Sequence, residues 1–513
     1  MRIQSFLTVI LVAGGFTMAH AMEDAGFAAI TQELTALQEA GRFSEADAMA
    51  RKLLNESAGD FTTEQRRALE FEVERVRRTR MDYTVTEQEL IDLIRERIPD
   101  LTDEEFHAWD KEGRFDVRVI DGQKLYMNSS RANLFYRYPE LKKRRTGNSI
   151  GTWRKFIWEC YEQTRAQHDG TGALTVEPEK FELTMTITVD AGAVPAGETI
   201  RCWMPYGQQF ESQSSVELLS ASPAPAWINN PTYPMRSLYF EQPSKGAEPT
   251  VFQAAFTTAL APRYSPVDPE KVTRATRESF AEFDWFTREQ PPHIRFTDEF
   301  RALEKEIASG ETNPYLRARK YYDWMCDNIV YSFAREYSTL DNISDYVRAN
   351  GYGDCGQLTL MFMTLCRLGG IPARWQSGWI IYPMDKNLHD WCEIYIEPYG
   401  WIPVDVNYGI IFEQVDEQLT AEQCAELQDY YFGGLDAFRF IVNRDHGYPH
   451  YPEKVDFRSD TVDFQRGELE AGGRNLYFDQ FSYNLDVKYL SPMPGAVGED
   501  KAAPRPQGEN LAR

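Results

Sequence analysis

The chain has 513 residues and carries 55 Lys and Arg against 79 Asp and Glu, which gives a formal net charge of −24. Hydrophobic residues make up 42% of the chain and aromatic residues 13%, which excludes a disordered acidic protein. The acidic excess also argues against a nucleic-acid-binding protein, because phosphate contacts need clustered Lys and Arg. A chain of this length is expected to form about three or four domains.

The first 21 residues have the pattern of a cleavable signal peptide. Arg2 precedes an apolar stretch that begins at Phe6 and continues to Phe16, and Ala19-His20-Ala21 has small residues where a signal peptidase cuts. The apolar stretch is shorter than the roughly 20 residues that a membrane-spanning helix needs. We therefore expect a signal peptide at residues 1–21, no integral membrane segment, and a secreted or periplasmic protein.

Seven cysteines lie beyond this segment, and an odd number leaves at least one thiol unpaired within a monomer. An oxidising compartment permits disulfides, but the irregular spacing predicts no particular pairing. The sequence has no Cys-x-x-Cys pair, which argues against a zinc site built from thiolates. We expect no metal ion and no cofactor. The seven residues are Cys160, Cys202, Cys326, Cys355, Cys366, Cys392 and Cys424.

The N-terminal part, residues 22–150, has the pattern of a helical region. Ile30, Leu34 and Leu37 recur at helical spacing, and Gly41 ends that helix. No second copy of this unit follows at a fixed period, so the sequence does not predict a repeat array.

Residues 150–170 are expected to link this region to a strand-rich domain. Apolar and polar residues alternate along 181–189, as in a strand with one buried face. Shorter strand-like runs follow, separated by turns rich in Pro and Gly. The sequence therefore predicts an antiparallel β-sandwich-like domain at residues 175–265.

The remaining chain divides into three expected parts. Residues 270–450 return to helices and then strands, and they carry the chemical motifs. Residues 451–491 are expected to form C-terminal strands. The last part, 492–513, is rich in Pro, Gly and charge, which predicts a disordered tail.

Cys355 lies at the expected start of a helix in this third part. Asp354 is a good N-cap, and apolar residues at core spacing follow until Gly369-Gly370. The free backbone N–H groups and the positive dipole end at a helix start favour a thiolate over a thiol. Cys355 is therefore a candidate nucleophile. The alternative is a buried structural or disulfide-bonded cysteine.

His389 and Asp405 lie on two strand-like runs that a turn at Glu397–Gly400 joins into a hairpin. With a three-residue connection, Asp405 lies diagonal to His389 and within side-chain reach. A four-residue connection would put the two side chains on opposite faces unless a bulge corrected the register. The pair is a candidate base and orienting carboxylate for a nucleophile.

These residues resemble the transglutaminase-like superfamily, a branch of the papain-like cysteine enzymes. The resemblance is close over about 315–407, where four sequence blocks follow one another in the family's order. One position departs from the family pattern, because Asp390 follows the histidine where Ala is frequent. The blocks are Gly353-Asp354-Cys355-Gly356, Gly370-Ile371-Pro372-Ala373-Arg374, His389-Asp390-Trp391-Cys392-Glu393 and Gly400-Trp401-Ile402-Pro403-Val404-Asp405.

The resemblance implies an α+β fold, with a papain-like transglutaminase core preceded by the helical region and the sandwich-like domain. It implies catalysis by a Cys-His-Asp triad, in which Cys355 is the nucleophile, His389 the base and Asp405 the orienting acid. The expected function is an exported cysteine hydrolase that acts on peptide or amide bonds through a thioester. Its partner would be a peptide, protein or cell-wall peptide substrate. A cross-linking transamidase with the same residues and a catalytically silent binding scaffold are the alternatives.

Overall fold

The computed structural model describes residues 26–56, 61–146, 153–172, 174–175, 177–413 and 418–492. The expected signal peptide and all but the first residue of the expected tail lie outside these ranges. The chain divides into two compact units, one up to Thr146 and one from Gly147 onward.

The N-terminal unit combines helices with a small antiparallel sheet of strand order β1-β3-β2. Thr62 and Thr86 start two of the helices with capping boxes. In each box the threonine side chain accepts the backbone N–H of the third helical residue, whose side chain accepts the backbone N–H of the threonine. The elements are a helical segment over 26–39, α2 (Phe43–Glu56), α3 (Thr63–Asp82), β1 (Tyr83–Val85), α4 (Glu87–Arg95), α5 (Asp103–Lys111), β2 (Val117–Ile120), β3 (Gln123–Met127), α6 (Ser130–Arg137) and η1 (Pro139–Arg144).

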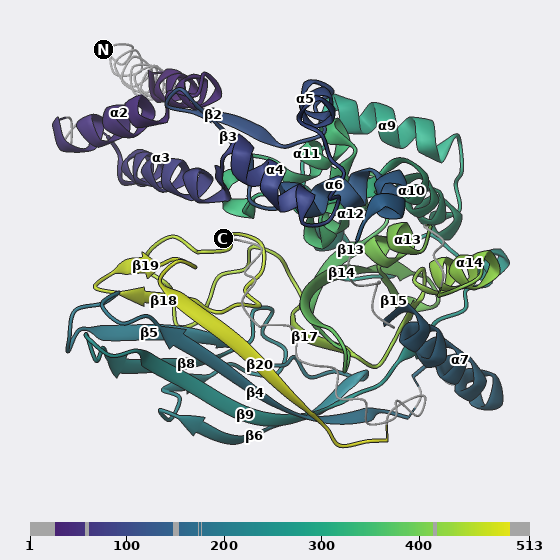
Figure 1. Ribbon diagram of the computed structural model, residues 1–513. Coiled ribbons are helices and arrows are strands. Elements are labelled where there is room, and N and C mark those ends of the chain that lie inside the picture. The colour runs from purple at the N-terminus through teal and green to yellow at the C-terminus, as the bar shows by residue number, and fades with distance from the viewer. Residues whose placement is uncertain are drawn as a thin grey trace, which may run out of the picture. The chain divides into compact units, whose positions relative to one another are not determined.

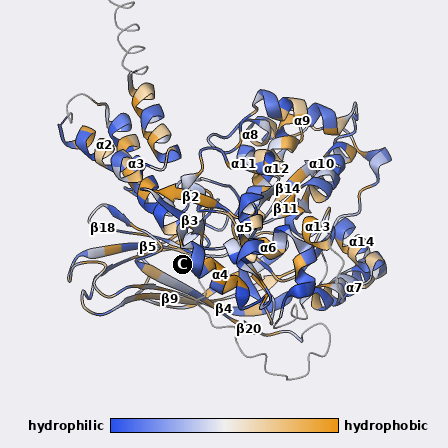
Figure 2. Ribbon diagram, turned by 45° about the horizontal axis from the view of Figure 1, so that its top comes forward, coloured by the Kyte–Doolittle hydropathy of each residue, from blue (hydrophilic) through white to orange (hydrophobic). Residues whose placement is uncertain are grey.

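Residues 22–150 were expected to be mostly helical, and their described part is mostly helical, with three short strands that the sequence did not indicate. Each strand has only three to five residues, and neither β2 nor β3 alternates clearly between buried and exposed positions. A period of two is therefore not visible in the sequence. Figure 2 shows hydrophilic and hydrophobic residues together on the helices of this unit, as in helices that bury one side.

The second unit contains two antiparallel sheets with the strand orders β20-β4-β9-β6 and β19-β18-β5-β8-β7 (Figure 1). The alternating residues of β4 are buried on one face as expected, from Phe181 to Val189. The strands are β4 (Glu179–Val189), β5 (Thr199–Pro205), β6 (Gln213–Ser222), β7 (Trp227–Ile228), β8 (Ser237–Pro243), β9 (Thr250–Leu260), β18 (Glu468–Ala471), β19 (Arg474–Leu476) and β20 (Phe481–Tyr489).

The C-terminal strands complete this sandwich. β20 pairs with β4 over nine residue pairs, from Phe481 opposite Val189 to Tyr489 opposite Phe181. β18 pairs with β5 in the other sheet. The sequence predicts strands at 451–491 as a separate segment, but both sheets need them, because a sheet edge without a partner leaves backbone groups unpaired.

Residues 150–170 were expected to be a linking segment, and the structure corrects this. They lie largely in α7 (Trp153–Thr171), a helix that buries Phe156, Ile157, Cys160 and Tyr161. These four residues recur at helical spacing, so the signal was present in the sequence.

The remaining elements build the core that carries the motifs. Its antiparallel sheet has the order β15-β14-β13-β17. The elements are β10 (Arg263–Tyr264), η2 (Pro269–Lys271), α8 (Phe283–Thr287), α9 (Asp298–Ala308), α10 (Pro314–Asn328), β11 (Val330–Tyr331), η3 (Tyr337–Thr339), α11 (Ile343–Asn350), β12 (Tyr352–Gly353), α12 (Cys355–Leu368), β13 (Ala373–Ile381), β14 (Lys386–Ile396), β15 (Gly400–Val404), α13 (Val406–Glu413), α14 (Ala421–Tyr430), β16 (Gly434–Leu435) and β17 (Arg439–Asn443).

Helix α12 is the central element of this core. It packs against β13 and β14 and is buried along nearly its whole length, as expected of a helix that is hydrophobic all round. One face of β14 lies under it, with Cys392 and Ile394 in the same hydrophobic cluster as Leu358 and Leu365. The fold is thus α+β with antiparallel sheets, as predicted.

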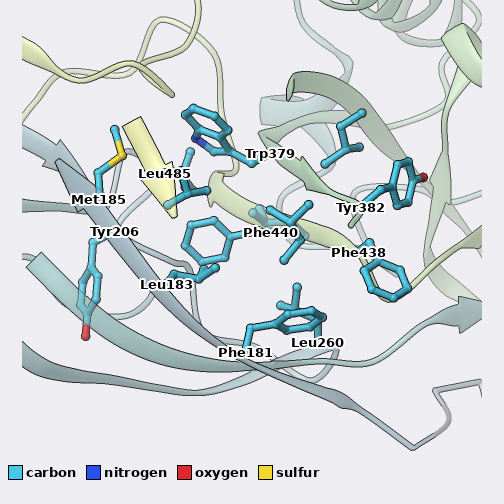
Figure 3. Close-up of a cluster of buried hydrophobic side chains, with 14 of the residues drawn as sticks. Phe181, Leu183, Met185, Tyr206, Leu260, Trp379, Tyr382, Phe438, Phe440 and Leu485 are labelled. Atoms are coloured by element: carbon cyan, nitrogen blue, oxygen red, sulfur yellow. The ribbon is translucent and has the colours of Figure 1, made fainter. Parts of the chain in front are cut away.

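A second hydrophobic cluster joins the sandwich to the core sheet. Figure 3 shows Leu183 of β4 and Leu485 of β20 close to Trp379 of β13 and Phe440 of β17. Burying these side chains together makes the sandwich and the core sheet one compact unit.

Candidate active site

Cys355 is the first residue of α12, where the sequence predicts it. Asp354 is the N-cap, and its Oδ1 accepts a hydrogen bond from the backbone N–H of Gln357 at 3.1 Å. The hydroxyl of Tyr337 donates to the same oxygen at 2.6 Å. The helix start is therefore held by a partly buried network of hydrogen bonds.

The hairpin that carries His389 and Asp405 has the three-residue connection. β14 ends at Ile396 and β15 begins at Gly400, with Ile396 opposite Gly400 and Cys392 opposite Val404. Continuing this register places Asp405 opposite Trp391, on the same face as His389.

His389 and Asp405 are joined directly. Nε2 of His389 lies 2.7 Å from Oδ2 of Asp405, and Nη1 of Arg439 lies 2.7 Å from the same oxygen. The other oxygen, Oδ1, accepts the backbone N–H of Tyr408 at 3.1 Å at the start of α13. All three side chains are almost completely buried. The structure thus brings together two of the three predicted triad residues, and it adds an arginine that the sequence reasoning missed.

The protonation of this pair follows from its surroundings. Burial would raise the pKa of Asp405, but His389, Arg439 and the N–H of Tyr408 hold it below its usual value. Burial lowers the pKa of His389 more than Asp405 raises it. His389 is therefore neutral near pH 7, and because a carboxylate only accepts, Nε2 carries the proton. Nδ1 is then a basic nitrogen, and no hydrogen bond occupies it among the described residues.

The thiol of Cys355 is hydrogen-bonded to Asp390 and not to His389. Sγ lies 3.4 Å from Oδ2 of Asp390. Asp390 shares a face of β14 with Cys392, under α12, whereas His389 shares the other face with Trp391, with which it stacks. Within the described residues, no hydrogen bond joins Cys355 to His389.

The charge around Cys355 opposes the expected thiolate. Burial raises the pKa of the Cys355 thiol well above its usual value, and the carboxyl groups of Asp390 and Asp354 raise it further. The helix start was expected to lower this pKa. The structure corrects that expectation, because two acidic side chains face the thiol, and one of them follows His389 where the family frequently has Ala.

Asp390 is itself held in an acidic environment. Oδ1 accepts a hydrogen bond from Nε2 of Gln465 at 2.7 Å, and the same amide nitrogen binds the backbone oxygen of His389 at 2.9 Å. Burial raises the pKa of Asp390 well above its usual value, and the charges of Asp354 and Asp460 add to the rise. Gln465 lies 75 residues beyond Asp390, and Asp463 lies two residues before Gln465, so no local pattern could have indicated them.

Glu393, the last residue of the histidine block, has a structural role. Its oxygens accept hydrogen bonds from Arg263 and Arg374, each at 2.6 Å, and from Gln376 at 2.8 Å. Burial would raise its pKa, but Arg374, Arg263 and Arg444 hold it far below the usual range. It is a buried anion that ties β10 and β13 to β14.

All seven cysteines are free thiols, and Cys355 alone is not fully buried. The described part of the chain contains no group of three or more His, Cys, Asp or Glu placed to hold a metal ion. None of the described helices is both long enough and apolar enough to cross a membrane.

Comparison with known proteins places this core in a family. The sequence profile of the transglutaminase-like superfamily matches residues 301–406. An uncharacterized protein of Haemophilus influenzae is 24% identical over 231 residues, which cover 39% of this chain and 61% of the relative. The chain thus matches about three fifths of that relative's length.

The solved structures that match this chain have lower sequence identity. A structure from Cytophaga hutchinsonii described as a putative cysteine protease is 15% identical, with a TM-score of 0.40, over 62% of this chain and 93% of that one. The periplasmic domain of TgpA from Pseudomonas aeruginosa is 14% identical, with a TM-score of 0.26, over 48% of this chain and 97% of that one. Residues 301–406 are therefore a transglutaminase-like domain.

Proposed function

We propose that this protein is a cysteine hydrolase that cleaves peptide or amide bonds through a thioester on Cys355. One observation carries the proposal: the 2.7 Å contact between Asp405 and His389, whose strand β14 packs against the helix starting at Cys355. This pair supplies a neutral imidazole with a free basic nitrogen, which a cysteine nucleophile requires.

The proposed reaction has two stages. Nδ1 of His389 takes the thiol proton, Sγ bonds to the carbonyl carbon, and the imidazolium then protonates the leaving amine as the C–N bond breaks. Water next attacks the thioester, gives its proton to His389, and releases the acid and the thiol. The backbone N–H of Cys355 is a donor for the oxyanion, because the first N–H groups of a helix lack partners within it. The thiol must leave Asp390 before it can meet His389.

The substrate class of this proposal is a peptide, a protein or a cell-wall peptide, and the setting is extracellular or periplasmic. The setting rests on the signal-peptide pattern of residues 1–21. Transfer to an amine in place of water remains the alternative reaction, since both share the thioester.

The test is incubation of the purified protein with a peptide library, with and without a primary amine, followed by mass spectrometry of the products. We expect new carboxyl termini that do not form with Cys355→Ser. If amide adducts dominate at millimolar amine, the protein is a transamidase. If neither product forms with any peptide while the protein is folded, the hydrolase proposal is wrong and the binding scaffold takes its place.

A further inference from the structure

We propose that Asp390 is a positioning residue that holds the Cys355 thiol in its protonated form, so that the nucleophile becomes reactive only when this hydrogen bond opens. The inference deepens the proposed function, on which it rests for the role of Cys355. The contact itself is the 3.4 Å distance from Sγ to Oδ2.

The geometry shows that Asp390 is built into this position. Gln465 fixes its other oxygen, and the hydroxyl of Thr359 binds the backbone oxygens of both Cys355 and Asp390, at 2.8 and 3.3 Å. A side chain at Gly356 would come within 2.7 Å of Oδ2 of Asp390. The start of α12 therefore needs a residue without a side chain at this point, so that the carboxyl group fits beneath the helix.

The acidic side chains around the thiol favour its protonated form and outweigh the backbone N–H of Asp390, which lowers the thiol pKa. Asp354 faces it from the N-cap, Asp390 from β14, and the Tyr337 hydroxyl from η3. Behind Asp390 lie Asp463 and Asp460. Arg466 is a cation beside these carboxyl groups, and it forms salt bridges to Glu336 and Asp460, at 3.0 and 3.2 Å.

His389 does not offset these charges. Its ring stacks on Trp391 and contacts Tyr408, on the face of β14 opposite to Asp390. The proton on Nε2 of His389 is donated to Asp405, and burial keeps the imidazole ring neutral. A neutral ring without a bond to Sγ gives no charge that would stabilise a thiolate. In the resting state, Asp390 therefore keeps the Cys355 thiol protonated.

The experiment measures the alkylation rate of Cys355 by iodoacetamide from pH 6 to 10, with peptide mapping, in the full-length protein. In the wild type, Cys355 still reacts fastest of the seven, because the other six are buried, but its rate rises only above the pH at which an ordinary cysteine titrates. Asp390→Asn removes the carboxyl group that accepts the thiol hydrogen bond, at nearly constant volume. We expect alkylation at pH 7 to become about tenfold faster or more, and the midpoint to shift down by a unit or more.

Asp486→Asn is the matched control, because this aspartate is exposed on β20, and its rate should equal that of the wild type. Asp390→Ala replaces the first variant if Asn prevents folding, which circular dichroism reports. An unchanged or slower rate in the folded Asp390 variant would overturn the inference. The outcome is separate from the proposed function. Faster alkylation without turnover on any peptide would support the role of Asp390 and contradict the hydrolase proposal.

Discussion

His389 and Asp390 are neighbours in the sequence, but their side chains lie on opposite faces of β14. One binds Asp405, the other binds Cys355. Because side chains alternate along a strand, two adjacent polar residues serve two different environments. The two side chains therefore have different partners, and the reaction needs the thiol to exchange its hydrogen bond to Asp390 for one to His389.

Asp405→Asn tests the pairing at the level of single residues. The amide keeps the volume but can donate to Nε2, which favours the wrong imidazole tautomer. We expect turnover to fall by about 10⁴-fold, as in serine triads. Stability should fall by roughly 1.5–3 kcal/mol, because a hydrogen bond between a carboxylate and buried Arg439 is weakened. Kinetics on a cleaved peptide and urea unfolding measure the two effects.

Asp436→Asn is the control for that loss of stability. Asp436 is the other buried carboxylate of Arg439, at 3.0 Å from Nε, and it does not contact His389. Asp436→Asn should lower the free energy of unfolding by about as much as Asp405→Asn does, and it should reduce turnover far less. Equal loss of turnover in both variants would mean that Arg439, and not the tautomer of His389, limits the reaction.

Among the elements, β20 adds the end of the described chain to one edge of the sandwich, beside β4. Its inward side chains enter the cluster that also contains residues of β13 and β17 (Figure 3). The sequence pattern indicates a strand here, but pairing with β4, about 300 residues earlier, depends on how the whole chain folds.

Leu485→Ala tests this placement. Leu485 is 2% exposed, and its truncation leaves a cavity, so we expect a loss of about 2–5 kcal/mol in the free energy of unfolding. Asp486→Ala, one residue further on the exposed face, should stay within about 0.5 kcal/mol of the wild type. Chemical denaturation measures both. Equal stability of the two variants would contradict the assignment of β20 to the core.

For the whole molecule, buried histidines make stability depend on pH. Burial lowers the pKa of His293 to about 4, and it lowers those of His446 and His450 well below the usual value. Such a group binds a proton more readily in the unfolded chain. Its contribution to stability is therefore full above pH 6.5 and is lost as the pH falls toward the folded pKa. Asp354, with a raised pKa of about 6, acts in the opposite sense.

His293→Gln separates the two effects. Between pH 7 and pH 5, the wild type should lose about 2 kcal/mol of unfolding free energy relative to this variant. Asp354 is present in both proteins, so its contribution cancels. Urea unfolding at the two pH values measures the difference. Parallel pH profiles would mean that His293 is not held neutral by burial.

The sequence by itself determined the elements that carry local signals. The helix that starts at Cys355 follows from an N-cap and an apolar run, and the long strand of the sandwich follows from its alternation. The hairpin pattern reduced the register of His389 and Asp405 to two possibilities. These features depend on residues within a few positions of one another, and local propensity and periodicity describe such features well.

The tertiary structure decided what depends on residues far apart in the chain. Arg439 and Gln465 reach the site from segments 34 and 75 residues away from their partners, and β20 returns to β4. The protonation of Cys355 also belongs here, because burial and carboxylates from other segments outweigh the helix start. Desolvation and charge act through space, so a thiolate indicated by the local sequence becomes a protonated thiol in the folded protein.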